Sequence, residues 1–115
     1  MAEHGAAVVT CPQSNAKLAA GRAPLAAMLR RGLWVALGAD SAASNNSLDL
    51  FWEIDFAAKL HKVNPSDPTA TPARHLLRMA TWRVAATLGL VEGHGALNPG
   101  SPADLILINR NQPGL

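Results

Sequence analysis

The sequence predicts an α/β fold built on a parallel sheet. Two short apolar runs, at residues 6–11 and 33–37, do not alternate with polar residues, which is typical of strands buried on both faces. A helical pattern lies between them, so this part of the chain has the order and length of one βαβ crossover unit. The composition, 49% hydrophobic and 16% charged, is sufficient for one small globular domain and is unlike that of a disordered segment.

The elements of the first half can be assigned in order. Residues 12–21 are polar and predict a loop. Pro24 is suited to the first turn of a helix that runs past Leu29, and Gly32 is placed to end it. The second strand runs directly into Asp40, which puts a carboxylate at the carboxyl end of that strand. The small polar residues 41–47 then predict another loop.

Two further helices are predicted in the second half. Residues 48–63 are apolar around much of the helix circumference, which indicates a largely buried helix that Asn46 or Ser47 can cap. After a loop at 64–71, one long helix is expected to end at Gly89. Its apolar stripe consists of Leu76, Leu77, Ala80, Val84 and Leu88. Residues 103–108 predict a last strand, but these elements leave open sheet edges and do not form a closed architecture.

Composition excludes several classes of function. The net charge is only +2, without a clustered basic stripe, which argues against nucleic-acid binding. The sequence contains no apolar run long enough to span a bilayer and begins without a signal-peptide pattern, so we expect a cytoplasmic protein with no membrane partner. The single cysteine, Cys11, cannot form an internal disulfide and is more typical of a packed small hydrophobe than of a nucleophile.

The four histidines do not show the spacing of a metal-ligand cluster. We expect most of them at the surface or at helix ends. His61 and Lys62 in particular suit the carboxyl end of a helix, where the helix dipole favours positive charge.

Several separated motifs, in family order, resemble the amidohydrolase superfamily. They are residues 11–18 (CPQSNAKL), 37–46 (LGADSAASNN), 58–63 (AKLHKV) and 77–81 (LRMAT). The branch of methylthioadenosine and S-adenosylhomocysteine deaminases is the most similar, with the triazine chlorohydrolases as relatives. Residues 95–106 (GALNPGSPADLI) resemble that family's return from its barrel into a small β domain.

The resemblance implies a fragment of a metal-dependent (β/α)8 TIM-barrel hydrolase. Residues 1–92 would hold the C-terminal part of the barrel, namely its last two strands and their helices, and residues 93–115 the start of a β-sandwich domain. Asp40 matches the family's aspartate that ligates the metal and handles the proton of the attacking water; the metal would be zinc, with iron as the alternative. The candidate pocket residues are Ser14, Asn15, Ser41 and Ser44.

Interpreted without the family, these residues have simpler roles. Asp40 would be a turn or cap residue, and Ser14 and Asn15 would bond to their own backbone. The resemblance also leaves the substrate open between deamination and dechlorination, because Thr10 and Ser41 depart from the residues that relatives often carry there.

The implied function is hydrolysis of a C–N or C–Cl bond of a small purine- or triazine-like heterocycle through metal-activated water. The family's histidine ligands and catalytic glutamate belong to earlier strands, so we expect this chain by itself to bind no metal and to be inactive. A second hypothesis is a non-catalytic small α/β module that forms homo-oligomers or binds a partner, and association with the missing part of the barrel is a further candidate interaction.

Overall fold

The computed structural model describes residues 2–63, 67–90 and 92–111 and contains a parallel βαβ unit. After a short 3-10 turn, η1 (Ala2–His4), strand β1 (Ala7–Thr10) pairs in parallel with β2 (Trp34–Leu37). Helix α2 (Leu25–Arg30) lies between the two strands in sequence, as predicted. In this register Thr10 is opposite Leu37, so both strands end at the same edge.

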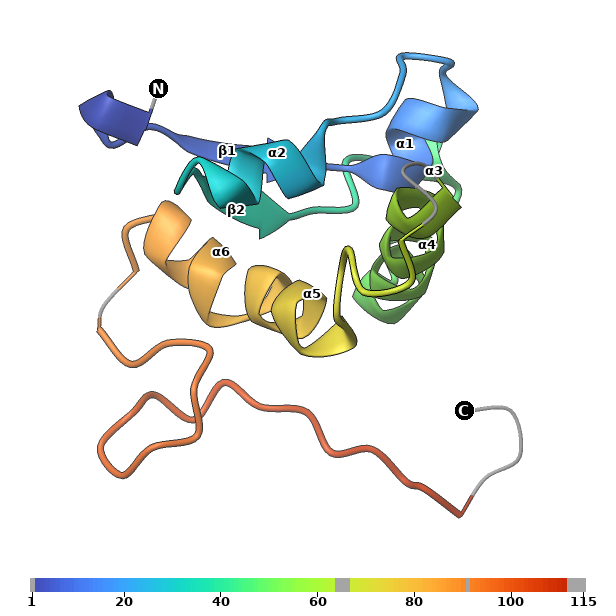
Figure 1. Cartoon of the computed structure of the whole chain (residues 1–115). Helices are drawn as coiled ribbons and strands as arrows, with labels where there is room; N and C mark the ends of the chain where they lie inside the picture. Colours follow the sequence, from blue (N-terminus) through green and yellow to red (C-terminus); the bar gives the residue numbers. More distant parts are fainter. Residues whose placement is uncertain (1, 64–66, 91, 112–115) are drawn as a thin grey trace.

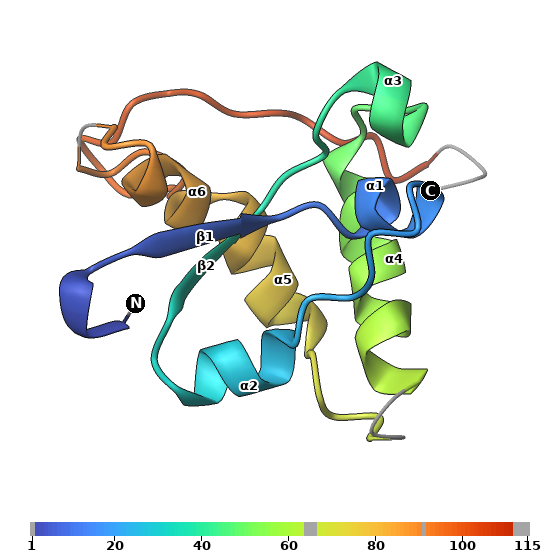
Figure 2. The ribbon, with the colours of Figure 1, turned by 90° about the horizontal axis from the view of Figure 1, so that it is seen from above.

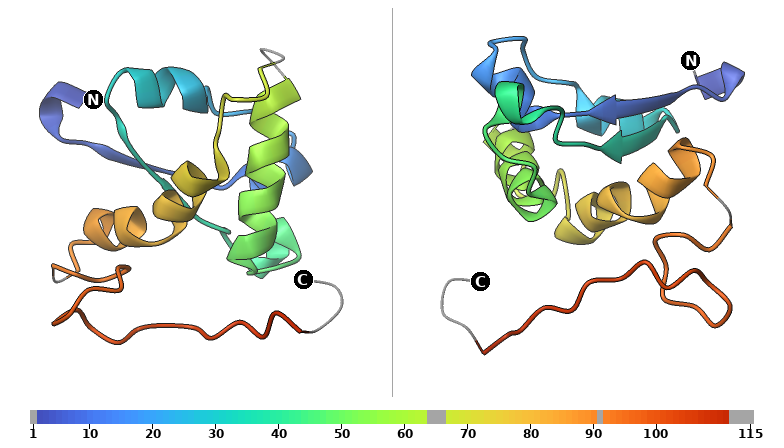
Figure 3. Two further views of the ribbon diagram at one scale, coloured as in Figure 1. Left: turned by 60° about the horizontal axis from the view of Figure 1, so that its bottom comes forward. Right: turned by 180° about the vertical axis from the view of Figure 1, so that it is seen from behind.

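The helices fall into two groups (Figures 1 and 2). Helices α2 and α5 (Ala73–Ala80) flank β2, and α6 (Trp82–Thr87) follows α5. Helices α1 (Pro12–Lys17), α3 (Ala42–Asn45) and α4 (Leu50–Val63) gather beyond the carboxyl ends of the strands. Figure 3 shows the same separation from two other sides. The segments that follow the two strands therefore meet one another at this end of the sheet.

The hydrophobic core is centred on β2. It consists of Leu25, Val35, Leu37, Ala57, Leu76 and Met79. The prediction of a strand buried on both faces is confirmed for β2, whose Val35, Ala36 and Leu37 are all buried. It is wrong for β1, where Val9 is 48% exposed, because α2, α5 and α6 all pack on β2.

The two predicted loops next to the strand ends contain short helices. Residues 12–17 form α1 with Pro12 in its first turn, and residues 42–45 form α3 with Ser41 as its cap. Both segments are short and polar, so they lack the apolar periodicity on which a prediction from sequence depends. Helices of this length are marginal by themselves, and tertiary contacts decide whether they form.

Helix α4 is confirmed, but the expectation that it is largely buried is wrong. Phe51 and Trp52 are 47% and 68% exposed, whereas Glu53, Ala57 and His61 form the buried stripe at i, i+4 and i+8. The sequence predicted that Asn46 or Ser47 caps this helix. Its first turn is instead held by Asp49, whose carboxylate accepts a hydrogen bond from the Phe51 amide at 2.8 Å.

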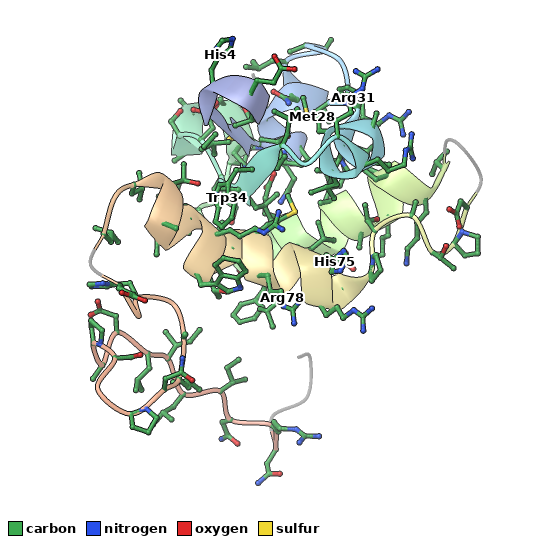
Figure 4. All side chains as sticks on the ribbon, turned by 60° about the vertical axis from the view of Figure 1, so that its left-hand side comes forward. His4, Met28, Arg31, Trp34, His75 and Arg78 are labelled. Atoms are coloured by element: carbon green, nitrogen blue, oxygen red, sulfur yellow. The ribbon has the colours of Figure 1, made fainter. Side chains whose placement is uncertain are left out.

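The predicted long helix at residues 72–88 is two helices. Thr81, with φ −119° and ψ −108°, interrupts it, so the apolar stripe does not continue along one face. Leu76 is fully buried, while Leu77 and Leu88 are exposed. The break brings Trp82 against Trp34, with ring centroids 5.3 Å apart in a T-shaped pair. Trp34 lies on the side of the molecule that also carries His75 and Arg78 (Figure 4).

The predicted strand at 103–108 does not form. These six residues are exposed and lie beyond α6, away from the edges of β1 and β2 (Figures 1 and 3). A strand needs a neighbouring edge with which to exchange backbone hydrogen bonds. His94 contacts this segment, since its Nε2 lies 3.5 Å from the Asp104 carboxylate.

Gly95 provides a test of how the segment after α6 docks. It has φ +75°, and a Cβ there would lie 2.5 Å from the backbone nitrogen of Trp82. We expect Gly95→Ala to detach residues 93–96 from α6 and to speed proteolytic cleavage within 92–111. Gly100→Ala is the matched control, since Gly100 has φ +85° but open space around it and should cost only about 1–2 kcal/mol of backbone strain. Equal cleavage rates for the two variants would contradict the docking.

Candidate functional site

Asp40 lies at the carboxyl end of the sheet, three residues after β2, and its side chain is exposed. Its backbone has φ +63°, a left-handed conformation that aspartate tolerates better than most residues with a side chain. Such a conformation persists where the surroundings hold it, and it occurs often at functional sites. The side chain is therefore directed by a constrained backbone at the edge where both strands end.

Two hydroxyl groups bind the Asp40 carboxylate. Ser14 Oγ, from α1, donates to Oδ2 at 2.7 Å, and Ser44 Oγ, from α3, donates to the same oxygen at 2.8 Å. Ser14 is buried, so its hydroxyl is held in one place. These hydrogen bonds, that of Ser14 first, lower the pKa of Asp40 below its usual 3.8. The carboxylate is thus ionised at neutral pH and supported from the loops after both strands.

The structure separates the four candidate pocket residues. Ser14 and Ser44 bind Asp40 through their hydroxyl groups, whereas Ser41 acts on it through its backbone N–H and its side chain forms the capping box of α3 with Ser44. Asn15 is not brought to Asp40; it lies beside Thr10 and His61 around a small hollow on the other side of α1. Neither Ser14 nor Asn15 donates a side-chain hydrogen bond to its own backbone in the described part of the chain.

A buried carboxylate that sequence reasoning missed, Glu53, joins the loops behind Asp40. It accepts hydrogen bonds from the backbone and side-chain nitrogens of Gln13, both at 2.8 Å, and from Asn45 Nδ2 at 3.1 Å. Asn45 Nδ2 also donates to the Ala39 carbonyl at 2.6 Å. Glu53 is one of several charged residues on the predicted helix 48–63, so the sequence pattern contained no signal that singled it out.

Lys17 completes the contact between α1 and α3 at the surface. Its Nζ donates to the Ala43 carbonyl at 2.8 Å and also to the side chain of Asn46. Asn46 ends α3 in a left-handed conformation with φ +67°. Three independent contacts therefore fix the segment after β1 to the segment after β2: Lys17 with α3, Ser14 with Asp40, and Glu53 with both.

Cys11 lies close enough to the Asp40 and Glu53 carboxylates for their charges to act on its thiol. Burial raises the pKa of its thiol, and the negative charges of Asp40 and Glu53 raise it further. The thiolate is the reactive form of cysteine, so these surroundings suppress reactivity. The structure agrees with the expectation of a packed small side chain.

His61 lies at a helix end, as predicted, but its surroundings differ from those expected from the helix dipole alone. Although it lies in the last turn of α4, it is buried, and burial first and the Arg22 charge second lower its pKa below 6.5. The helix dipole would favour the charged form, but desolvation is the larger effect. His4 and His75 are exposed, as expected.

The lowered pKa of His61 predicts a pH dependence of stability. As the pH falls below 6.5, His61 takes up a proton in the unfolded chain before it does so in the folded chain. The contribution of neutral His61 to stability is therefore complete above this pH and is lost progressively as the pH falls toward the pKa of His61 in the folded chain. We expect the urea midpoint to fall between pH 7.5 and pH 5.5, and to fall less in His61→Gln. His75→Gln, an exposed histidine, is the control and should behave as the parent. An equal pH response in His61→Gln would contradict the assignment.

The described residues do not bring together a complete set of metal ligands. No group of three or more His, Cys, Asp or Glu side chains in this part of the chain is arranged to bind one. A catalytic zinc site normally has three protein ligands and an open position. Asp40 has the right chemistry for one of them, an ionised oxygen ligand at an exposed edge, so the remaining ligands would have to come from other polypeptide.

The fold and this edge define a general class before any comparison. Parallel α/β enzymes place their reacting groups outside the carboxyl ends of the strands, where Asp40 lies.

No helix within the described ranges has the length and apolar character required to cross a membrane.

Comparison with known proteins gives the family. The profile of the amidohydrolase family matches residues 1–113, and the chain belongs to this family. It is 51% identical over 113 residues to a 5-methylthioadenosine/S-adenosylhomocysteine deaminase 1 from Syntrophus aciditrophicus, a match that covers 98% of this chain and 26% of that protein.

Two solved structures are similar to most of the chain. An adenosine deaminase from Xanthomonas campestris with bound zinc aligns with a TM-score of 0.84 and 45% identity, over 90% of this chain and 24% of that one. A triazine hydrolase variant aligns with a TM-score of 0.81 and 34% identity, over 89% and 23%. The chain therefore spans about a quarter of the length of these relatives.

Proposed function

We propose that this chain is a C-terminal part of a metal-dependent amidohydrolase that removes an amino group from a purine-like heterocycle. The observation that carries the proposal is the ionised, doubly hydrogen-bonded carboxylate of Asp40 at the carboxyl edge of a parallel βαβ unit. The identity of about half to a named deaminase favours a C–N bond over a C–Cl bond. A triazine substrate remains the second candidate because of the structural likeness to a triazine hydrolase.

In this proposal β1 and β2 are the last two strands of a (β/α)8 barrel within residues 1–92, and residues 93–115 begin a β-sandwich domain. Two features support it. The described segment beyond α6 carries apolar residues, Leu105 to Ile108, that are exposed and unpaired with β1 or β2, as expected of a segment that would pair with further strands of that β-sandwich. In addition, Phe51 and Trp52 on α4 are exposed apolar surface that further polypeptide would cover.

The chain's own residues would perform a limited set of steps. Asp40 would act as one metal ligand and would accept the proton of the attacking water. Ser14 and Ser44 donate to one carboxylate oxygen, Oδ2, and so would hold Asp40 ionised and fixed in direction. A zinc ion, or iron as the alternative, would make water acidic enough to attack near neutral pH when the remaining ligands are supplied.

A chimera tests this proposal directly. The matching segment of the Syntrophus aciditrophicus relative is replaced by this chain, and release of ammonia from 5-methylthioadenosine and S-adenosylhomocysteine is measured together with zinc content. We expect turnover and bound metal, because the chain would complete the barrel with its own Asp40. The proposal would be refuted if the chimera folded but bound no metal and released no ammonia while the parent enzyme was active in the same assay.

Light scattering on the chain alone separates the proposal from its main competitor. A free-standing module would form a defined, well-folded dimer or larger oligomer through its open strand edges. A barrel fragment should form no oligomer of defined size, since its open edges and exposed apolar residues match other polypeptide and not a second copy of themselves.

A further inference from the structure

Glu53 is unusual because it is a fully buried carboxylate held by neutral groups. It accepts three hydrogen bonds, two from Gln13 and one from Asn45. No lysine or arginine within the described ranges forms an ion pair with it. Removing a charge from water is costly, and a well-packed apolar side chain in the same place is often no less stable. The carboxylate is therefore better explained by the geometry that it imposes than by stability.

The hydrogen-bond partners of Glu53 are connected to Asp40 in three ways. Gln13 directly precedes Ser14, which donates to the Asp40 carboxylate. Asn45 directly follows Ser44, the second donor to the same oxygen. Asn45 Nδ2 also binds the carbonyl of Ala39, the residue before Asp40 in the chain.

Each group that holds Asp40 is thus one residue away from a partner of Glu53. The left-handed backbone at Asp40, with φ +63°, needs such external support because the conformation is unfavourable by itself. Glu53 enters from a different element, α4, and so fixes the loop after β1 and the loop after β2 relative to each other.

We propose that Glu53 is a positioning residue that sets the direction of the Asp40 side chain through Gln13 and Asn45. The importance of that direction for hydrolysis rests on the function proposed above, but the positioning itself does not. It predicts that loss of the Glu53 charge loosens α1 and α3 at Asp40 while the core around β2 stays intact.

The test is Glu53→Gln in this chain, followed by amide hydrogen exchange and NMR contacts between Ser14 and residues 40–44. Glutamine keeps the shape but presents one acceptor oxygen and one NH2 group to donors. We expect exchange at the Gln13 amide to accelerate on the order of ten-fold, since a hydrogen bond to a charged acceptor is lost or weakened. The Ala36 amide in β2 should be unaffected, and the contacts from Ser14 should weaken.

Asp55→Asn is the matched control, because Asp55 is on the same helix but exposed and paired with Lys59. It should leave Gln13 exchange and the Ser14 contacts unchanged. Unaltered exchange at Gln13 in Glu53→Gln would overturn the proposal, and so would an equal acceleration at Gln13 and Ala36, which would indicate general destabilisation.

A second variant keeps the test decisive if Glu53→Gln does not fold. Asn45→Ala removes the bonds to Ala39 and to Glu53 and leaves both Gln13 bonds, so it should loosen residues 39–44 and keep Gln13 protected. In the chimera, Glu53→Gln should reduce kcat with little change in KM, and Asp55→Asn should change neither. An inactive chimera that still shows the exchange pattern would refute the proposed function alone, whereas full activity with an unchanged pattern would refute the positioning role.

Discussion

Asp40→Asn in the chimera is expected to lower kcat by a factor on the order of 10²–10⁴, the usual contribution of a positioned acid or base. The amide is similar in shape to the carboxylate, but it carries no negative charge for a cation and does not accept a proton from water near neutral pH. Metal content should fall at the same time, because an anionic oxygen ligand is lost.

The control for this prediction is Asp55→Asn, which removes a carboxylate from the exposed side of α4, where Asp55 lies 2.6 Å from Lys59. Exposed ion pairs of this kind contribute little, so activity should remain within about two-fold of the parent chimera. If Asp40→Asn retained both metal and turnover, Asp40 would be a loop residue and not a ligand.

Leu76→Ala is expected to lower the free energy of unfolding strongly. Leu76 is fully buried against β2 and α4 in the main cluster, and removal of such a side chain costs about 2–5 kcal/mol. Leu77→Ala is the matched control one position along the same helix, where the side chain is 49% exposed. Urea unfolding should separate the two variants clearly, and equal midpoints would contradict the orientation of α5.

That pair of leucines also illustrates the limits of helical periodicity. Sequence pattern placed Leu76 and Leu77 on one stripe of a single helix, but the chain breaks at Thr81 and only Leu76 enters the core. In the same way, β2 was identified from its apolar run as a fully buried strand, whereas β1 has a similar run and exposes Val9. Periodicity describes which residues can be buried, while the neighbours that bury them belong to tertiary structure.

The candidate site divides along the same line. Asp40 could be predicted because it follows a recognisable strand and stands within a family motif, and Ser14 and Ser44 were named as candidates in the loops beside it. Asn15 was named on the same grounds but faces the other side of α1, since successive residues of a helix point in different directions. The outcome for His61 had the same cause: its burial depends on what packs against the end of α4.

The sequence by itself determined the parallel βαβ unit, the carboxylate after its second strand, and the family. These depend on local patterns and motifs that are contained in short stretches of chain. The tertiary structure alone decided that Gln13, Asn45 and Glu53, which belong to three different helices, share one hydrogen-bond network, and that Ser14 and Ser44 bind the same oxygen of Asp40. The physical reason is that a buried charge must find its donors wherever the fold brings them, and no local pattern encodes that meeting.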